Sequence, residues 1–294
     1  MVSAKLASTI LVSYLLVVAT VCNAGLSPFY YGNSCPQAAD IVKTEVTNIL
    51  QSNPNLAGGF LRLHFHDCWV NGCDGSVTIK STADNLAEVD GNVNFQLRAI
   101  PEIDQIKAAV EAQCPNTVSC ADIVALAARD ATVYACGPDW PVALGRRDSR
   151  VSHANDADTQ LPFPVLSFSG LVQNFANKGF TDREMIVLSG SHTIGHTHCN
   201  GIGPNLYNYT GQDSLTDTNP HLDSSFAASL KKPVRKETDD ELLRGPSGAS
   251  TVQYLAQPGS SWLAEFSNGM TKMGQLSPLL APDGEIRRTC QVIN

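Results

Sequence analysis

The stretch Leu61–Ser76, which reads LRLHFHDCWVNGCDGS, constrains this chain more than any other part of its sequence. It places an arginine, two histidines, two aspartates and two cysteines among apolar residues that would otherwise form an ordinary core. If Leu61–Asp67 is helical, Arg62 and His66 lie four residues apart on one face. A fixed cation and a titratable base can then act on one point, which is typical of a catalytic pair. The alternative is a buried ion pair beside a structural disulfide.

The residues that follow this pair offer a dense set of oxygen atoms. Three side chains and two interleaved carbonyls share a short loop, which a disulfide between Cys68 and Cys73 could close. A set made only of oxygen ligands suits a hard cation, calcium before any transition metal. The candidate ligands are Asp67, Val70, Gly72, Asp74 and Ser76.

Residues 1–24 have the pattern of a secretory signal peptide. Lys5 is the one charged residue before an uncharged run that ends in small residues at Ala24. We expect cleavage after Ala24, which makes residues 25–294 the mature chain. A membrane anchor is the alternative, but the apolar run is shorter than the roughly 20 residues of a bilayer span and no basic cluster follows it. The formal net charge of −8 gives no electrostatic case for nucleic acid or anionic lipid as a partner.

The cysteine content indicates a disulfide framework. Nine cysteines less Cys22 of the predicted signal leave an even number in an oxidising compartment. The sequence alone leaves their connectivity open. The hydrophobic residues, 43% of the chain, are sufficient for one large core, and no internal repeat or long linker divides it.

Every strong apolar periodicity in the chain is helical, which predicts an all-α protein. Thr181 and Glu184 form a capping-box pattern at the start of one of these helices. The expected helices cover about 41–53, 61–67, 95–112, 119–135, 181–188, 223–232 and 261–273.

A second histidine cluster lies in the segment LSGSHTIGHTHC at 188–199. His192, His196 and His198 fall within seven residues, and the first two have helix-face spacing that a zinc site could use. In the zinc hydrolase pattern His-Glu-x-x-His, the residue after the first histidine is the general base. Here that residue is Thr193, which cannot serve as a base, so zinc hydrolysis is disfavoured.

At both histidine motifs the chain closely resembles the secreted plant haem peroxidases of the class III family. The resemblance implies an all-α, two-lobed fold, tied by disulfides, with haem b (iron protoporphyrin IX) between a distal and a proximal helix. It implies that Arg62 and His66 activate hydrogen peroxide and that His192 is the axial ligand of the iron. Small phenolic reductants would be the electron donors, docking at the haem edge beside Pro162 in the segment Leu161–Pro164.

The resemblance also assigns partners to the two histidines. In the family an asparagine accepts the ring N–H of the distal histidine, and Asn92 in Glu88–Asn94 is the best match. The glutamate spacing there is shorter and the run to Arg98 longer than is usual, and a solvent-exposed turn is the alternative. On the proximal side, Asp239 is the nearest match for the aspartate that accepts the other ring nitrogen of His192.

Calcium is the second cofactor that the resemblance implies. It makes the oxygen-bearing residues after His66 a distal calcium site and adds Glu88 to them. Trp69 departs from the phenylalanine that is usual within this motif. Of the proximal calcium ligands only those at Thr193 are retained, so we do not expect a complete proximal site.

Three disulfides follow from the resemblance: Cys35 with Cys114, Cys68 with Cys73, and Cys120 with Cys290. Asp122 and Arg146 correspond to a buried ion pair of the family. The chain is short near 232–238, where a family member carries the partner of Cys199 and most of the proximal calcium ligands. We therefore expect Cys136 and Cys199 to be unbridged, and haem to be held less firmly than in a full-length relative.

The expected function is haem-dependent reduction of hydrogen peroxide by a monomer in the extracellular space or cell wall, with one-electron oxidation of phenolic donors. The alternative is a truncated, weakly haem-binding or inactive secreted protein with a binding role. Asn208, in the sequence Asn-Tyr-Thr, is the expected glycosylation site.

Overall fold

The computed structural model describes residues 25–94, 96–163, 166–195, 203, 205–207, 209–211, 217–220, 222–231 and 248–294. The predicted signal peptide, the segment near 232–238, His196, His198, Cys199, Asn208 and Asp239 lie outside these residues. The described part of the chain is helical, and its only β-structure consists of isolated bridges such as Ser27 with Leu144. None of the described helices combines the length and the apolar character needed to cross a bilayer.

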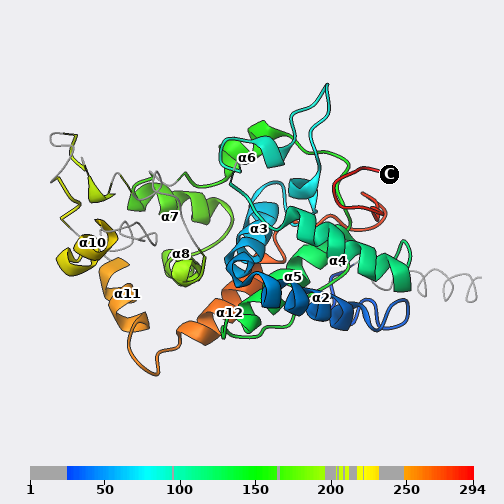
Figure 1. Ribbon diagram of the computed structural model, residues 1–294, viewed down its shortest axis with the longest axis horizontal. Helices are drawn as coiled ribbons and strands as arrows, with labels where there is room; N and C mark the ends of the chain where they lie inside the picture. Colours follow the sequence, from blue (N-terminus) through cyan, green and yellow to red (C-terminus); the bar gives the residue numbers. More distant parts are fainter. Residues whose placement is uncertain are drawn as a thin grey trace, which may run out of the picture.

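The helices form two groups, and α3 lies in the first group where it faces the second (Figure 1). The bounds in the first group are α2 Ala38–Ser52, η1 Pro54–Leu56, α3 Ala57–Trp69, η2 Ser76–Thr78, η3 Glu88–Asp90, α4 Ile100–Gln113, α5 Cys120–Tyr134 and α6 Ala154–Gln160. The bounds in the second are α7 Phe168–Asn177, α8 Asp182–Ser189, η4 Gly190–Thr193, α10 Ser224–Lys231, α11 Gly248–Leu255 and α12 Trp262–Met273. The predicted all-α class is confirmed.

Helix α5 is the centre of the first group, and both α2 and α3 pack against it. Its sequence is apolar almost all round, so nearly all of its residues are buried, as is expected for a central helix. Ser119 caps its start by accepting the backbone N–H of Asp122. The amphipathic α2 buries Val42, Val46 and Leu50 against this centre, as their spacing predicts.

The helix expected over 95–112 begins later than predicted, at Ile100. Ala99 adopts a left-handed conformation with φ of 72°, which interrupts a right-handed helix at that point. Pro101 then occupies the first turn, where its missing N–H is not needed for an intrahelical hydrogen bond. The predicted pattern rests on Ile103, Ile106 and Val110, and all three are buried in α4, so only the start of the helix differs.

The second group contains the chain's second histidine motif. Helix α8 starts with the predicted capping box, in which Thr181 accepts the N–H of Glu184 and Glu184 accepts the N–H of Thr181. Its apolar face packs against α12, whose buried residues include Phe266 and Met270. The short 3-10 turn η4 follows directly and carries His192.

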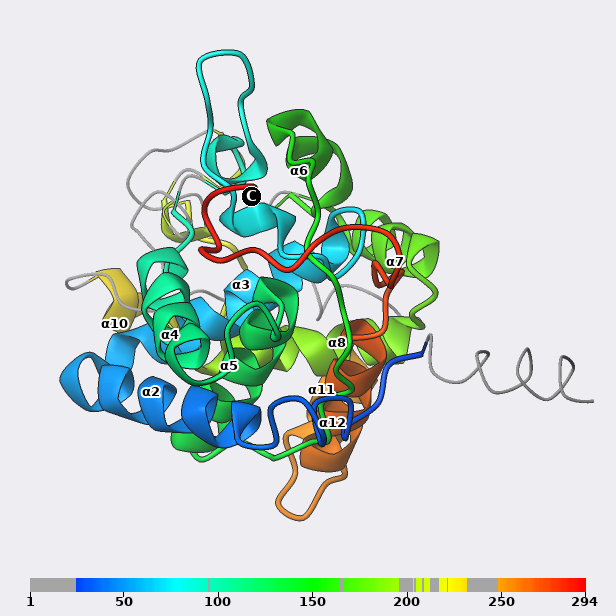
Figure 2. The same cartoon turned by 90° about the vertical axis from the view of Figure 1, so that its right-hand side faces the viewer.

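Three disulfides join parts of the chain that are distant in sequence or close a short loop. They are Cys35–Cys114, Cys68–Cys73 and Cys120–Cys290, and all three predicted pairs are confirmed. The last one brings the C-terminal segment back from α12 to the start of α5 (Figure 2). Cys136 is a free, exposed thiol, as expected.

Candidate active site and cation-binding loop

Helix α3 positions the candidate catalytic pair. Phe60, Leu63 and the disulfide-bonded Cys68 face the core, which leaves the neighbouring face for polar side chains. On that face Nε of Arg62 donates to Nε2 of His66 over 3.0 Å, so the predicted one-face arrangement of these two residues is confirmed. Nη2 of Arg62 also donates to the carbonyl of Val93, which ties the guanidinium to the loop before α4.

The side chain on the other ring nitrogen of His66 is Asn94, not Asn92. Oδ1 of Asn94 lies 2.5 Å from Nδ1 of His66. The amide of Asn94 is oriented independently, because its Nδ2 donates to the carbonyl of Glu88 over 2.7 Å. An amide oxygen only accepts, so Nδ1 of His66 carries the proton and Nε2 has the lone pair that Arg62 contacts.

The assignment of Asn92 to this contact was wrong by two residues. Asn92 is exposed, and its Nδ2 donates to Asp158 over 2.7 Å. Two successive tight turns cause the shift, since Gly91 donates to the carbonyl of Glu88 and Asn94 donates to the carbonyl of Gly91. The sequence offers no signal that separates the two asparagines, because these turns determine which of them is buried.

The buried position of His66 keeps its imidazole neutral. The ring is 5% exposed, and burial together with the adjacent Arg62 cation lowers the pKa of His66 to about 3. A neutral ring with a free Nε2 lone pair can accept a proton from a molecule that binds beside Arg62. His64 is also buried and its pKa is lowered to about 3 by burial and then by Arg146, but its ring contacts Cys68 rather than this pair.

The loop after α3 contains buried oxygen atoms without a protein partner. Both carboxylate oxygens of Asp67, both of Glu88 and the hydroxyl of Ser76 are buried, and they have no hydrogen-bond partner among the residues that the structure describes. Buried carboxylates almost always have a partner, so this group of oxygens fits a cation that the chain itself does not provide. The predicted calcium ligands Asp67, Asp74 and Ser76 are buried close together, since the backbone N–H of Ser76 donates to Asp74 and the charges of Asp74 and Glu88 act on Asp67.

The acidic side chains of this loop influence one another strongly. Burial raises the pKa of Asp67, and repulsion from Asp74 and Glu88 raises it further. Burial and then Asp74 raise the pKa of Glu88 to about 8. Within the described residues no three His, Cys, Asp or Glu side chains converge as a metal site by themselves. A cation here would therefore also need the hydroxyl and carbonyl oxygens of the loop, as the oxygen-only set predicts.

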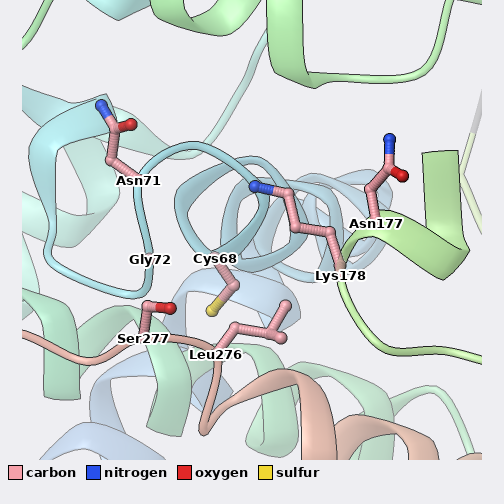
Figure 3. A pocket seen from close by; sticks show the side chains of 7 residues that line it. All are labelled: Cys68, Asn71, Gly72, Asn177, Lys178, Leu276 and Ser277. Atoms are coloured by element: carbon pink, nitrogen blue, oxygen red, sulfur yellow. The ribbon is translucent and has the colours of Figure 1, made fainter.

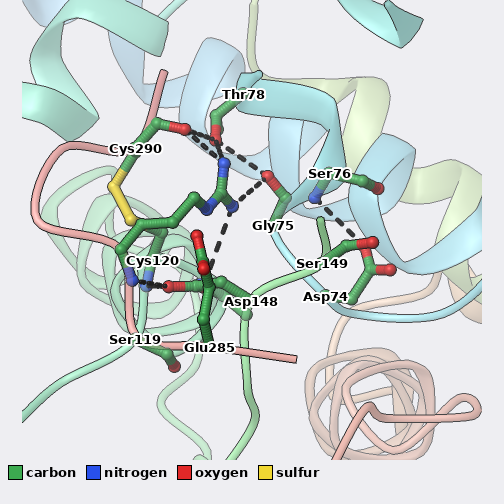
Figure 4. A network of polar contacts seen from close by, with 12 residues as sticks. Asp74, Gly75, Ser76, Thr78, Ser119, Cys120, Asp148, Ser149, Glu285 and Cys290 are labelled. Atoms are coloured by element: carbon green, nitrogen blue, oxygen red, sulfur yellow. Dashed lines mark hydrogen bonds and ion pairs between the residues drawn. A yellow bond between two sulfur atoms is a disulfide. The ribbon is translucent and has the colours of Figure 1, made fainter. Parts of the chain in front are cut away.

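A buried arginine holds the far end of this loop. Nη2 of Arg287 donates to the carbonyl of Gly75 over 2.7 Å, and Nη1 donates to the carbonyl of Cys290 (Figure 4). Asp148 lies beside the guanidinium and accepts the backbone N–H groups of Cys120 and Arg287. The C-terminal segment and the start of α5 therefore fix the loop in place.

The glycine at the middle of the loop is required by its surroundings. Gly72 has φ of 114°, and a Cβ atom there would collide with the carbonyl of Ser277. The loop thus lies directly on the turn that follows α12, and Cys73 donates its backbone N–H to Leu276 in that turn. Val70 is buried at the C-cap of α3, and Gly72 lies against the turn after α12. The backbone that carries the two predicted carbonyl ligands is therefore held on both sides.

Trp69 is accommodated in an aromatic cluster at the end of α3. Its ring centroid lies 4.8 Å from Phe65, 4.5 Å from Phe175 and 5.5 Å from Phe180. The indole N–H donates to Oδ1 of Asn174 over 2.7 Å, a hydrogen bond that phenylalanine cannot make. The larger ring is therefore packed and has a polar partner.

The proximal residues are described only in part. His192 is exposed on η4, and the hydroxyl of the exposed Thr193 donates to the carbonyl of Gly190 over 2.8 Å. The turn lies against the start of α3, because a Cβ atom on Gly58 would be 2.7 Å from Cα of Gly195. The two elements that carry His66 and His192 are thus neighbours. An exposed histidine such as His192 can ligate a haem iron, and a neutral histidine such as His66 can lie on the open side of the haem. These two residues therefore fit a haem.

The predicted donor-contact loop leaves an aromatic side chain at the surface. Leu161 is 4% exposed, whereas Phe163 is 42% exposed and Pro162 is half-buried between them. Exposed apolar and aromatic groups on a loop suit contact with a small aromatic molecule. Pro164 lies outside the described residues.

Comparisons with known proteins agree with these features. Residues 42–270 match the family model described as "Peroxidase". "Peroxidase 1" of Oryza sativa subsp. japonica is 40% identical, and the alignment covers 98% of this chain and 99% of that protein. "Peroxidase 3" of Arabidopsis thaliana is 39% identical over 96% of this chain and 97% of its own length. "Peroxidase 5" of Vitis vinifera is 40% identical over 92% of each chain.

The alignment lengths bear on the predicted shortening of the chain. The alignment with the rice protein spans 324 positions, more than the 294 residues of this chain. That relative therefore has residues that this chain lacks. The segment near 232–238, where the sequence predicts the loss, lies outside the described residues.

Proposed function

This chain belongs to the class III plant peroxidases, haem-dependent oxidoreductases that reduce hydrogen peroxide, and we propose that Arg62, His66 and Asn94 are the residues that act on the peroxide. The observation that supports the assignment is the directed chain of contacts from Arg62 through His66 to Asn94. The relatives that match nearly the whole chain are all named peroxidases, and no observation favours an inactive binding protein.

Haem b is the proposed redox cofactor, with His192 as its axial ligand and Asp239 as the partner of the other ring nitrogen of His192. When bound, haem would supply the redox chemistry, in which peroxide accepts two electrons and donor molecules replace them one at a time. The chain's own residues bind and orient the peroxide, move its protons and admit the donor.

His66 is proposed to transfer the proton between the two peroxide oxygens. Its Nε2 lone pair accepts the proton of the attacking oxygen, and the imidazolium then gives this proton to the oxygen that leaves as water. Asn94 keeps the reactive nitrogen unprotonated before the reaction, because it holds the ring proton at Nδ1. Arg62 stabilises the negative charge that develops as the O–O bond breaks, since its guanidinium is always protonated.

The donor is proposed to be a small phenol that contacts the loop at Pro162. The exposed Phe163 next to it offers an aromatic surface. The distal calcium ion is proposed to be held by Asp67, Val70, Gly72, Asp74 and Ser76, with Glu88 close by. The unpartnered buried oxygens of Asp67 and Ser76 support this assignment. Thr193 alone does not support a proximal ion.

Residues 1–24 are proposed to direct secretion, leaving a haem peroxidase domain over 25–294 that acts as a monomer outside the cell. The three disulfides support an oxidising compartment.

The test is reconstitution of the chain with haem and calcium, followed through the Soret band, and then stopped-flow measurement of its reaction with hydrogen peroxide. The intact chain should consume peroxide and oxidise a simple phenol. The His66→Ala variant should react with peroxide about 10²–10⁴-fold more slowly. Activity that survives this change would place the acid–base role on another residue.

A further inference from the structure

Three amide side chains connect the end of the distal helix α3 to the loop that carries Pro162. We call Asn71, Gln160 and Asn174 the amide cluster. Asn71 lies in the loop 70–76 that follows α3 and carries the proposed calcium ligands, which we call the cation loop. Gln160 is the last residue of α6, and Asn174 lies in the middle of α7. None of them contacts the proposed catalytic residues, so the proposed peroxide chemistry does not explain them.

The side chain of Gln160 is bonded to the cation loop. Its Nε2 donates to Oδ1 of Asn71 over 2.8 Å, and its Oε1 accepts the backbone N–H of Asn71 over 3.2 Å. Asn71 has φ of 61°, a left-handed conformation that asparagine tolerates better than most residues. This strained turn is thus fixed to Gln160 by two reciprocal hydrogen bonds. Oε1 of Gln160 also accepts from Nζ of Lys178 over 2.9 Å.

The backbone of Gln160 is bonded to α3 by a separate route. Nδ2 of Asn174 donates to the carbonyl of Gln160 over 3.0 Å, and Oδ1 of Asn174 accepts the indole N–H of Trp69 over 2.7 Å. Trp69 is fully buried among three aromatic rings, so it is a fixed point. The tryptophan is essential to this route, because a phenylalanine ring has no donor for Asn174.

Both routes end on the residue that precedes the proposed donor-contact loop. Leu161 and Pro162 follow Gln160 directly, and Leu161 is held by a backbone bond to Ala157. We propose that Gln160 is a positioning residue for the electron donor, fixing the loop 161–163 relative to α3 through Asn71 and through Asn174 and Trp69. This inference rests on the proposed function, since it concerns the donor site of the same peroxidase.

The surroundings of Gln160 allow its side-chain hydrogen bonds to be removed without unfolding the protein. Asn71 and Lys178 line a pocket of about 280 Å³ together with Gly72, Asn177 and Ser277. Figure 3 shows the side chain of Lys178 extending from the end of α7 toward the loop that holds Asn71. Because Asn71 is exposed and the pocket lies beside it, water can replace a lost side chain at Gln160 without leaving a buried polar group unpaired. The Gln160→Ala variant should therefore fold.

The experiment uses the haem-loaded, calcium-loaded chain and four variants, the fourth being Gln160→Glu. Gln160→Ala removes the route through Asn71, whereas Trp69→Phe removes the indole donor and keeps an aromatic ring in the cluster. Gln173→Ala is the control, because Gln173 lies on the exposed face of α7 and its side chain donates to Asn177 of the same helix. The rate constants for peroxide and for a phenolic donor are measured separately by stopped flow. Amide hydrogen exchange of Leu161 and Phe163 is measured without donor.

In the Gln160→Ala and Trp69→Phe variants, the donor rate constant should fall about two- to tenfold, the range expected for one or two ordinary hydrogen bonds. Exchange at Leu161 and Phe163 should become faster, and the peroxide rate constant should stay at the wild-type value. Gln160→Glu keeps the oxygens that accept from Asn71 and Lys178, so it should recover part of the donor rate.

An unchanged donor rate in both variants would overturn the inference, as would unchanged exchange in the loop. Equal losses in the peroxide and donor rates would also overturn it, because they would indicate general damage. If the intact chain does not react with peroxide at all, the proposed function fails instead. In that case the exchange data still decide whether Gln160 fixes the loop.

Discussion

Glu88 orients Asn94 with its backbone while its side chain faces the buried cation loop. Its carbonyl accepts Nδ2 of Asn94, and the two oxygens of its carboxylate are buried without a partner. Asn94 in turn sets the protonated nitrogen of His66. Glu88 and Asn94 thus connect the buried carboxylates to the proposed base, in addition to the peptide bond between His66 and Asp67. Loss of the cation beside Glu88 should therefore reach the imidazole through Asn94.

The first prediction concerns the two asparagines of this turn. Asn94→Ala should slow the reaction with peroxide by about 10–100-fold, the usual effect of removing the partner that orients a functional histidine. Asn92→Ala is the matched control, since the same side chain is lost from an exposed position two residues away. Stopped-flow mixing of the haem-loaded variants with peroxide measures both rates. Equal losses in the two variants would contradict the assignment of Asn94.

The pH dependence of the peroxide reaction follows from the state of His66. The pKa of this residue is lowered to about 3, so Nε2 is free to accept a proton at any pH well above that value. The rate constant should be constant from about pH 7 down to about pH 4.5 and fall only as His66 becomes protonated near pH 3. Rapid pH jumps before mixing avoid loss of the fold. A midpoint near the ordinary histidine value of about 6.5 would show that the imidazole is not shielded as the structure indicates.

Removal of the distal cation should destabilise the chain and slow the peroxide reaction. A ligand present at about 100 times its dissociation constant adds about 2.7 kcal/mol, so a calcium chelator should lower the thermal midpoint by roughly 5–10 °C. Asp74→Asn should weaken calcium binding, whereas Asp84→Asn changes an exposed carboxylate outside the loop and serves as the control. Scanning calorimetry and metal analysis measure the two effects. A midpoint that does not respond to the chelator would show that the buried oxygens hold no cation.

The free thiol provides a simpler test. Cys136 should react with a thiol reagent in the folded protein, because it is exposed and not in a disulfide. The Cys136→Ser variant should lose one equivalent of label without a change in folding. Mass spectrometry of the labelled peptides identifies the site. Protection of Cys136 in the native protein would contradict its exposed position.

Much of the fold and part of the site could be predicted because the relevant interactions are local. The spacing of Arg62 and His66 depends only on helix geometry, and the capping box of Thr181 and Glu184 spans a single turn. The pairing of the cysteines is different. It came from the family resemblance, since nothing in the spacing of Cys120 and Cys290, which are 170 residues apart, determines that they meet.

The errors and omissions arise where tertiary structure or a tight turn decides the outcome. The error at Asn92 came from two consecutive turns, which shift the buried position by two residues. The start of α4 was placed too early because no sequence pattern shows that Ala99 takes a left-handed conformation just before Ile100. The amide cluster could not be foreseen at all, because Trp69 and Asn174 are 105 residues apart and no sequence pattern relates them.

The last prediction concerns the buried ion pair between Asp122 of α5 and Arg146, which lies in the segment just before Asp148. Nη1 of Arg146 donates to Oδ1 of Asp122 over 2.7 Å, and both side chains are almost completely buried. Oδ2 of Asp122 also accepts from the hydroxyl of Tyr31, which helps to raise the pKa of Tyr31 after the larger effect of its burial. Asp122→Asn removes the charge and keeps the shape, so Arg146 loses its counter-charge in a buried site. The expected loss is about 3–5 kcal/mol in the free energy of unfolding. Arg150→Ala, at a pair whose arginine is 58% exposed, should cost about 1 kcal/mol or less. Urea unfolding of both variants measures the difference, and similar small losses in the two would show that the buried pair is not important for stability.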